Sequence, residues 1–402
     1  MTCLPPYPLL GAILSTLLLV APPSRGTEER SLAAVADFAL ERAARQTEFL
    51  VSQLADRPEL PRTFEHGKLV TVDWRDWTSG FFPGTLWSLF EATGDPLWRN
   101  RAERFTARVA PAQHNRSTHD VGFVLTCSFG NGLRLTNEPD YRAVLLNGAA
   151  SLATRFNPTV GAIRSWDWAR QWEYPVIVDN LLNLELLLWA ARAGAEPRYR
   201  AIAMRHADTT LQNHFRPDAS SYHVVDYDPA TGGVRSKVTH QGAAHSSAWA
   251  RGQAWAIYGY TVLYRETREP RYLQQARASA DFIMNHPRLP VDKIPYWDFD
   301  APDIPHAPRD ASAAAVIASA LLELSTLLPK EDALAYADFA GAQLRSLASP
   351  AYLAAVGENG GFILQHSTGN FPRHSEVDVP LNYADYYFLE ALLRLRRSNP
   401  KA

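Results

Sequence analysis

Residues 175–193 read PVIVDNLLNLELLLWAARA, and this stretch decides how the rest of the chain is interpreted. Its apolar side chains recur at the spacing of a helix, at Leu181, Leu184, Leu188, Leu182 and Trp189. A helix that is apolar nearly all round belongs inside a protein. Asp179 and Asn180 stand at its first turn, where an aspartate ordinarily accepts a bond from a free backbone N–H. Taken alone, Asp179 is therefore interpreted as a helix cap.

A short sequence motif marks the start of further helices. An acidic residue, a proline and an aromatic residue two positions later occur at Asp95–Trp98, Glu138–Tyr141, Glu196–Tyr199 and Glu269–Tyr272, with a looser copy at Pro329–Asp332. Proline at the first helical position is typical of a helix start. Together with the N-terminal segment, these motifs predict six amphipathic, charged helices at 31–54, 96–110, 139–154, 197–213, 270–285 and 331–347.

Six less charged segments alternate with the charged helices. They are predicted to be inner helices at 80–92, 121–134, 179–193, 248–266, 311–328 and 382–396. Stacking six outer–inner hairpins in a ring buries the inner helices, so the sequence predicts an all-α, (α/α)6 barrel as a single domain over residues 27–402. All inner helices then begin at one end, where the longer loops meet and six helix N-termini favour an anionic ligand.

Residues 1–26 are predicted to be a signal peptide or an N-terminal anchor. The apolar run at 5–23 is short for a membrane span, and small residues and prolines lead to Gly26, as before a cleavage site. The segment before the run lacks Lys and Arg, so an uncleaved anchor stays open. We expect an exported protein, periplasmic in a bacterium. After cleavage only Cys127 remains, which excludes an internal disulfide.

The composition argues against some partners and favours others. The net charge is −2, so there is no basic field for nucleic acid, and we expect no stable membrane partner. The chain has 11 Trp, 16 Tyr and 17 Phe, and exposed indole faces are typical of clefts that bind sugars, although large helical cores also use aromatic residues. The sequence does not indicate an oligomeric state.

The predicted starts of the inner helices carry groups that helix caps do not need. Trp74 and Trp77 precede the first, as a sugar platform or as loop packing. His119 and Asp120 precede the second, and Asp179 precedes the third. Two neighbouring carboxylates can keep one proton between them at neutral pH, which provides a general acid and an ionised partner.

The loop before the fourth inner helix is the richest in polar groups. It holds His223 and then Gly232-Gly233, a turn that predicts a hairpin, followed by Thr239 and Gln241. Arg251 and Trp255 lie four residues apart and so share one helix face, where they suit a substrate carboxylate, or where Arg251 forms a structural ion pair. Asp310, before the fifth inner helix, is interpreted as a simple cap.

The chain contains none of the motifs that mark other chemistries. There is no nucleophile elbow, HExxH, P-loop or dinucleotide fingerprint, and no His-rich metal spacing. We therefore predict no metal and no cofactor, and chemistry that runs on carboxylates and imidazole.

Three motifs together resemble the unsaturated glucuronyl hydrolases of glycoside hydrolase family 88. They are His119–Phe123 (HDVGF), Val178–Asn183 (VDNLLN) and Ala248–Trp255 (AWARGQAW), and the resemblance spans about Ala34 to Arg396. The family's fold is the (α/α)6 barrel. Its enzymes remove a 4,5-unsaturated uronic acid from the non-reducing end of oligosaccharides that polysaccharide lyases release.

The resemblance implies roles for individual residues. Asp179 matches the general acid/base and Asp120 its partner carboxylate. The implied reaction is hydration of the vinyl ether, in which Asp179 protonates C4 and water adds at C5. The candidate substrate-binding residues are Trp74, His119, His223, Thr239, Gln241, Arg251, Trp255 and Ser367. A loop with Ser367, Thr368 and Arg373 is expected to meet a sulfate or acetamido group on the next sugar.

The residues also admit functions outside this reaction. An unsaturated rhamnogalacturonyl hydrolase would share the barrel and the chemistry, although the Trp249–Trp255 run favours the glucuronyl side. A glycan-binding protein without activity and an (α/α) polysaccharide lyase are equally compatible with the predicted barrel. The sequence does not indicate which glycosaminoglycan or which sulfation pattern is used.

Overall fold

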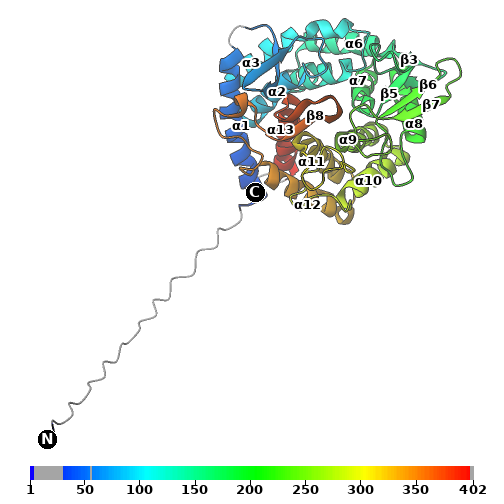
Figure 1. Ribbon diagram of the computed structural model, residues 1–402. Helices are drawn as coiled ribbons and strands as arrows, with labels where there is room; N and C mark the ends of the chain where they lie inside the picture. Colours follow the sequence, from blue (N-terminus) through cyan, green and yellow to red (C-terminus); the bar gives the residue numbers. More distant parts are fainter. Residues whose placement is uncertain (4–29, 55–56, 399–402) are drawn as a thin grey trace.

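The predicted helical hairpins are present in the computed structural model, which describes residues 1–3, 30–54 and 57–398. The outer helices are α1 (Leu32–Leu54), α3 (Pro96–Arg108), α6 (Pro139–Ala153), α8 (Arg198–Asn213), α10 (Pro270–Met284) and α12 (Lys330–Leu347). They surround the inner helices as a ring (Figure 1). The fold is the predicted (α/α)6 barrel, and its main apolar cluster runs from Val35 to Leu395.

The inner helices agree with their predicted ranges, with one exception. They are α2 (Phe81–Thr93), α7 (Asn180–Arg192), α9 (Ala250–Thr267), α11 (Ala311–Thr326) and α13 (Asn382–Ser398). The predicted helix at 121–134 is instead divided into α4 (Val121–Leu125), a π-helical turn (Thr126–Gly130) and α5 (Asn131–Thr136). A π turn inserts one residue into the helix and shifts the side chains that follow it, which periodicity alone does not reveal.

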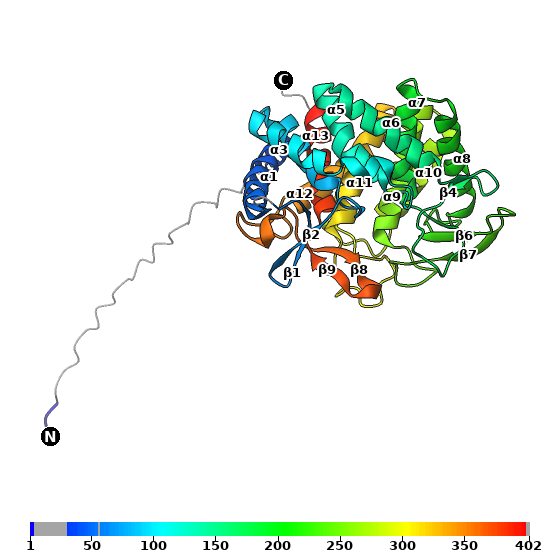
Figure 2. The ribbon, with the colours of Figure 1, turned by 90° about the horizontal axis from the view of Figure 1, so that it is seen from above.

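Short strands lie at the end of the barrel where the inner helices begin (Figure 2). They are β1 (Leu60–Glu65), β2 (Lys68–Val72), β3 (Phe156–Asn157), β4 (Ala162–Ile163), β5 (Pro175–Ile177), β6 (Val224–Tyr227), β7 (Val234–Val238), β8 (Ser367–Asn370) and β9 (Ser375–Val379). The antiparallel pairs are β1–β2, β3–β4, β5–β6, β6–β7 and β8–β9. Apart from the hairpin expected around Gly232-Gly233, the sequence does not predict these strands.

The predicted hairpin around Gly232-Gly233 is confirmed as β6–β7. Gly232 has φ +75°, and a Cβ there would lie 2.5 Å from the carbonyl oxygen of Thr159. Glycine is therefore required both by the backbone and by the close approach. The hairpin places His223, just before β6, beside the residues that follow β7, and so positions part of the candidate site.

Among the described residues, no helix has the length and apolar character needed to cross a membrane. The predicted signal peptide or anchor at residues 1–26 falls almost entirely outside the described residues. That segment, and the domain boundary at residue 27, stay predictions.

Candidate active site

Asp120 and Asp179 face the same cavity, as the sequence predicts. The cavity has a volume of about 520 Å³ and lies at the strand-bearing end of the barrel. Asp120 ends the loop before α4, and Asp179 links β5 to α7. Both residues occupy the N-cap position, yet neither side chain bonds to a backbone N–H of its helix within the described chain. Their carboxylates are therefore left for other partners.

Burial raises the pKa of both carboxyls. Desolvation raises the pKa of Asp120 to about 7, although the Thr118 hydroxyl, 2.6 Å from Oδ2, favours the ionised form. Desolvation also raises the pKa of Asp179 to about 7, opposed by the positive charge of Arg251 and increased by the charge of Asp120. Since each charge disfavours the other, the pair titrates as a unit and keeps one proton near neutral pH.

Two buried histidines stand behind the carboxylates. The Nε2 of His119 is 3.3 Å from Asp120 Oδ1, and the Nε2 of His223 is 3.7 Å from Asp179 Oδ2. His119 is fully buried and His223 nearly so, and neither lines the cavity. Burial lowers the pKa of His119 to about 3, so its ring is neutral at physiological pH. The structure thus places both predicted substrate-binding histidines against the carboxylates rather than at the cavity surface.

Arg251 lines the cavity and is also bonded to the protein through both terminal nitrogens. It pairs with Asp310 at 2.7 Å and donates to the carbonyl oxygens of Thr368 and Gly369. The structural ion pair, one of the two roles that the sequence leaves open for Arg251, is therefore present. Asp310 also caps α11, as predicted, by accepting from the N–H groups of Ser312 and Ala313. Arg251 still contributes its positive charge beside Asp179.

The other predicted binding residues divide into two groups. Trp74 and Gln241 line the cavity, and Gln241 donates to the carbonyl oxygen of Gly369 at 2.9 Å. Trp255 lies in the core, where its ring packs edge-on against Phe123 and its indole favours the ionised form of Asp179 from behind. Thr239 accepts the N–H of Gly242 in a turn, outside the residues that line the cavity.

The loop expected to meet the next sugar is arranged differently from the prediction. Ser367 and Thr368 are buried, and the Thr368 hydroxyl donates to the carbonyl oxygen of Arg309. Consecutive strand residues ordinarily face opposite sides, but the register of β8 on β9 shifts between Ser367 and Thr368, and both side chains are buried. The hairpin presents other residues to the cavity instead, namely Gly369, Asn370, Ser375 and Glu376.

Several cavity residues are not among those that the sequence predicts. An aromatic wall consists of Trp166 and Trp168, whose ring centroids are 4.9 Å apart, with His240 against them. The tryptophans belong to a loop whose aromatic content is a usable signal. Arg62 and Asp76 lie opposite, and Arg62 bonds to both Asp76 and Glu376. No local pattern marks this triad, because its members come from three separate segments.

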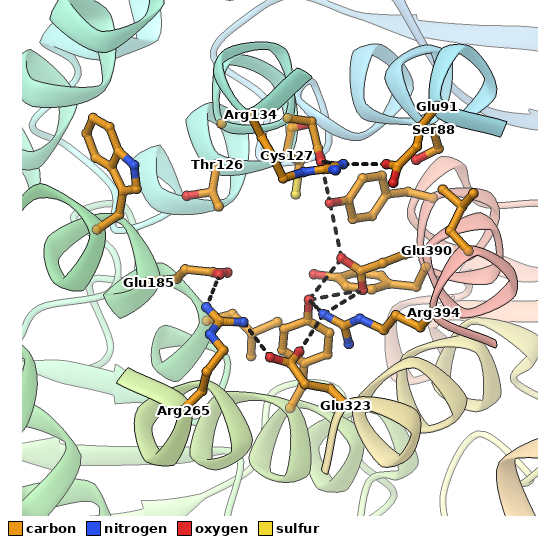
Figure 3. A pocket seen from close by; sticks show the side chains of 18 of the residues that line it. Ser88, Glu91, Thr126, Cys127, Arg134, Glu185, Arg265, Glu323, Glu390 and Arg394 are labelled. Carbon is orange, nitrogen blue, oxygen red and sulfur yellow. Dashed lines mark hydrogen bonds and ion pairs between the residues drawn. The ribbon is translucent and has the colours of Figure 1, made fainter. Parts of the chain in front are cut away.

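A larger cavity, of about 790 Å³, lies at the other end of the barrel, where the inner helices finish. Its wall is a network of ion pairs in which Arg265 contacts Glu185 and Glu323, and Arg394 contacts Glu323 and Glu390 (Figure 3). Here arginines pair with the carboxylates, whereas in the smaller cavity no arginine or lysine of the described residues forms an ion pair with Asp120 or Asp179. The smaller cavity is therefore the candidate active site.

A ring of six helical hairpins with a buried carboxylate pair in an aromatic cavity defines a carbohydrate-active enzyme of the (α/α)6 class. The model of Glycosyl Hydrolase Family 88 matches residues 57–387, and the chain belongs to this family.

Named relatives agree with this assignment. An unsaturated glucuronyl hydrolase of Formosa agariphila is 51% identical over 324 residues, which cover 80% of each chain. An unsaturated chondroitin disaccharide hydrolase of Streptococcus pyogenes serotype M1 is 32% identical, over 90% of this chain and 92% of its own. A crystal structure of an unsaturated glucuronyl hydrolase described as specific for heparin superposes with a TM-score of 0.86 at 49% identity, over 91% of this chain and 97% of that chain.

Proposed function

We propose that this enzyme removes the 4,5-unsaturated uronic acid from the non-reducing end of glycosaminoglycan oligosaccharides that lyases have released. The observation that carries the proposal is the carboxylate pair, Asp120 and Asp179, in one cavity with raised pKa values. A pair that shares one proton near pH 7 suits a reaction that first needs an acid and then a base. Kinship with the hydrolases above supports the same activity.

In the proposed reaction, protonated Asp179 donates its proton to C4 of the vinyl ether, and the C4=C5 double bond becomes a single bond. Positive charge develops on C5 and the ring oxygen, and ionised Asp120 stabilises it. Asp179, now ionised, takes a proton from water as the water oxygen bonds to C5. The resulting hemiketal opens to a ketone at C5, which leaves C1 as a hemiacetal. The hemiacetal collapses to an aldehyde, the bond from C1 to the glycosidic oxygen breaks, and the remaining sugar leaves as an alcohol. Asp179 ends the cycle protonated.

The cavity has the features that an anionic, unsaturated sugar needs. Asp179 is the N-cap of α7 and Asp120 that of α4, so both helices direct their positive ends toward it. Arg251 adds a buried positive charge. The Trp166–Trp168 wall offers ring faces to the sugars that follow the uronic acid. Together these features support binding of a uronate-ended oligosaccharide.

Among glycosaminoglycans we propose heparin-type disaccharides as the preferred substrate. The heparin-specific enzyme is 49% identical to this chain, whereas the chondroitin enzyme is 32% identical. Export to the periplasm, proposed from residues 1–26, would place the enzyme where lyase products collect.

One assay separates the proposed activity from a lyase, a rhamnogalacturonyl hydrolase and a silent binding protein. The purified protein is incubated with unsaturated disaccharides from heparin, chondroitin and pectin and, separately, with the intact polysaccharides, and the ultraviolet absorbance of the double bond is followed. We expect absorbance to fall fastest with the heparin-derived substrate. Fastest loss with the pectin-derived substrate would indicate a rhamnogalacturonyl hydrolase. A rise in absorbance on intact polysaccharide would indicate a lyase, and no change on any of them would contradict catalysis.

A further inference from the structure

Each carboxylate of the pair faces the Nε2 atom of a buried histidine. The distances are 3.3 Å for His119 and Asp120, and 3.7 Å for His223 and Asp179. A neutral imidazole carries a proton on one nitrogen only, so each ring either donates toward its carboxylate or repels it. The tautomer is decided by the partner of the other nitrogen, Nδ1.

The tautomer of His223 follows from two backbone groups. The N–H groups of His240 and Gln241 both point at its Nδ1, at 3.2 and 3.3 Å. A backbone N–H can only donate, so Nδ1 is an acceptor without a proton. The proton of the neutral ring is therefore on Nε2, toward Asp179.

The tautomer of His119 follows from Asn183, one turn along α7 from Asp179. The Asn183 Oδ1 accepts the backbone N–H of Phe123 at 2.7 Å, which fixes the orientation of the amide. Its Nδ2 is then the atom 3.2 Å from His119 Nδ1, and an amide NH₂ donates. Nδ1 is again the acceptor, so the proton of the neutral ring is on Nε2, which lies 3.3 Å from Asp120 Oδ1 and has no hydrogen-bond partner among the described residues.

Asn180 also influences the His119 ring. Its Nδ2 donates to the carbonyl oxygen of Ile163 at 2.8 Å, which leaves its Oδ1 as the acceptor on this side chain. Against the dominant effect of burial, the Asn180 side chain raises the pKa of His119, as an acceptor near a ring N–H does. Two asparagines of α7 thus act on the His119 ring.

The two carboxylates are not equally supported. Asp120 receives the Thr118 hydroxyl at 2.6 Å on one oxygen and faces the nearer imidazole with the other. Asp179 faces the more distant imidazole, and its Oδ2 has no hydrogen-bond partner in the described part of the chain. Arg251 and the Trp255 indole favour the ionised form of Asp179, and burial raises the pKa of both carboxyls to about 7, so a further donor from His119 would favour ionised Asp120 and shift the shared proton toward Asp179.

We propose that Asn183 is a positioning residue, which locks His119 as the neutral Nε2–H tautomer so that the ring donates to Asp120 and the proton of the pair resides on Asp179. The assignment of the acid rests on the proposed function, whereas the tautomer does not. Other titratable or charged groups also act on these residues. Asp76 and Arg155 act on Asp120, Arg155 and His206 interact with His119, and Arg251 acts on Asp179.

The test begins with nitrogen NMR of the wild-type protein labelled in histidine, with the His119 signals assigned by their loss in His119→Gln. We expect an unprotonated Nδ1 and a protonated Nε2 for His119, unchanged from pH 5 to pH 8. His206 is an internal control, because its Nδ1 accepts the backbone N–H of Ile163 at 2.9 Å and must show the same pattern. A proton on His119 Nδ1 in the wild type would overturn the proposal, whatever the variants do.

The matched variant is Asn183→Asp, which keeps the size and the acceptor for Phe123 but replaces the donor by a carboxylate. We expect a proton on His119 Nδ1 and no change at His206. The value of kcat should fall at least about tenfold, since the proton balance of the pair is lost, while KM stays within about twofold because Asn183 is outside the cavity lining. Wild-type spectra and kinetics in this variant would contradict the proposal.

Failure of the proposed function gives a different result. If no unsaturated disaccharide is turned over but His119 shows the expected tautomer, the role of Asn183 in fixing the tautomer is supported and the reaction assignment is wrong. If turnover occurs and His119 shows the other tautomer, the reaction assignment stands and the role of Asn183 is wrong.

Discussion

Three aspartates stand at the N-cap of inner helices, and only their surroundings separate structure from chemistry. Asp310 caps α11 through its side chain, whereas Asp120 and Asp179 do not cap α4 and α7. The same residue type at the same helical position permits either role. The sequence therefore predicts Asp120 and Asp179 as candidate catalytic residues and Asp310 as a helix cap. The Arg251–Asp310 pair is defined only when α9 and α11 are brought together.

Replacing Asp179 by Asn removes the proposed acid while keeping size and the β5–α7 connection. We expect turnover of the unsaturated disaccharide to fall by roughly 10²–10⁴-fold, the usual contribution of general acid–base catalysis. Absorbance loss at saturating substrate measures this, and an unchanged circular dichroism spectrum shows that the fold is intact. A variant that retains most of the activity would remove Asp179 from the mechanism.

The carboxylate pair also makes stability depend on pH. The pKa of Asp120 rises from an ordinary 3.8 to about 7 on folding, so between these values the folded protein binds the proton that the unfolded chain releases. The free energy of unfolding therefore decreases as pH rises from about 4 to 7. An asparagine at position 120 does not titrate, so the variant does not lose this part of its free energy of unfolding as pH rises. At pH 8, Asp120→Asn should therefore be more stable than the wild type by about 1 to 3 kcal/mol.

Urea unfolding at pH 5 and pH 8 checks this expectation. The difference between Asp120→Asn and the wild type should be larger at pH 8 than at pH 5. Equal differences at both values would mean that the pKa of Asp120 is not raised by folding.

At the residue scale, sequence misses groups that only tertiary structure assembles. Arg62 reaches Asp76 and Glu376, which are 14 and 314 positions away along the chain. His119 and His223 are predicted as substrate contacts, but in the structure both are buried next to the carboxylates and outside the cavity lining. The residues next to them in the sequence predict that both histidines lie near the carboxylates, whereas the direction of each side chain depends on non-local packing.

At the scale of elements, the helices are predictable and the strands are not. Apolar periodicity, together with the proline motifs that begin most of the outer helices, predicts twelve alternating helical segments. The strands have at most six residues, and β5 pairs with β6 across an intervening helical pair, so no local alternation defines them. Only β6–β7 is expected from sequence, because Gly232-Gly233 gives a local turn signal.

Two glycines of the interrupted inner helix provide a matched prediction. A Cβ on Gly122 would lie 2.5 Å from the Cα of Asn183, so α4 and α7 would have to separate. A Cβ on Gly130 would meet nothing closer than 3.6 Å, and its backbone is helical at φ −63°. We expect Gly122→Ala to cost about 1–3 kcal/mol, and Gly130→Ala to be neutral or to stabilise by up to about 1 kcal/mol.

Denaturant unfolding of both variants measures these effects. Because the Gly122 contact also supports Asn183, Gly122→Ala should lower activity as well. Equal stability of the two variants would contradict the close approach of α4 and α7.

At the scale of the whole molecule, the two ends of the barrel carry different groups of charged residues. The end where the inner helices begin holds the carboxylate pair, while the other end holds the ion-pair network of Arg265, Glu323 and Arg394 (Figure 3). This network joins α9, α11 and α13, so it ties neighbouring inner helices together at the end away from the strands.

Glu323→Ala tests the structural role of this network. It removes a partner of both arginines, each mostly buried, and should lower the free energy of unfolding by about 1–3 kcal/mol. The exposed pair Glu41–Arg45 on α1 is the control, and Glu41→Ala should change stability by less than about 0.5 kcal/mol. Equal effects of the two substitutions in urea unfolding would show that the network contributes no more to the free energy of unfolding than an exposed ion pair.

The most direct test of the central claim, that the carboxylate pair hydrates a double bond, is the reaction in D₂O followed by NMR of the released uronic acid. If Asp179 delivers the proton from one side of the ring, C4 of the early product carries one deuterium in a single stereochemical position. Simple cleavage at C1, followed by rearrangement of the product in solution, would place deuterium at C4 in both positions, and that mixture would contradict the account.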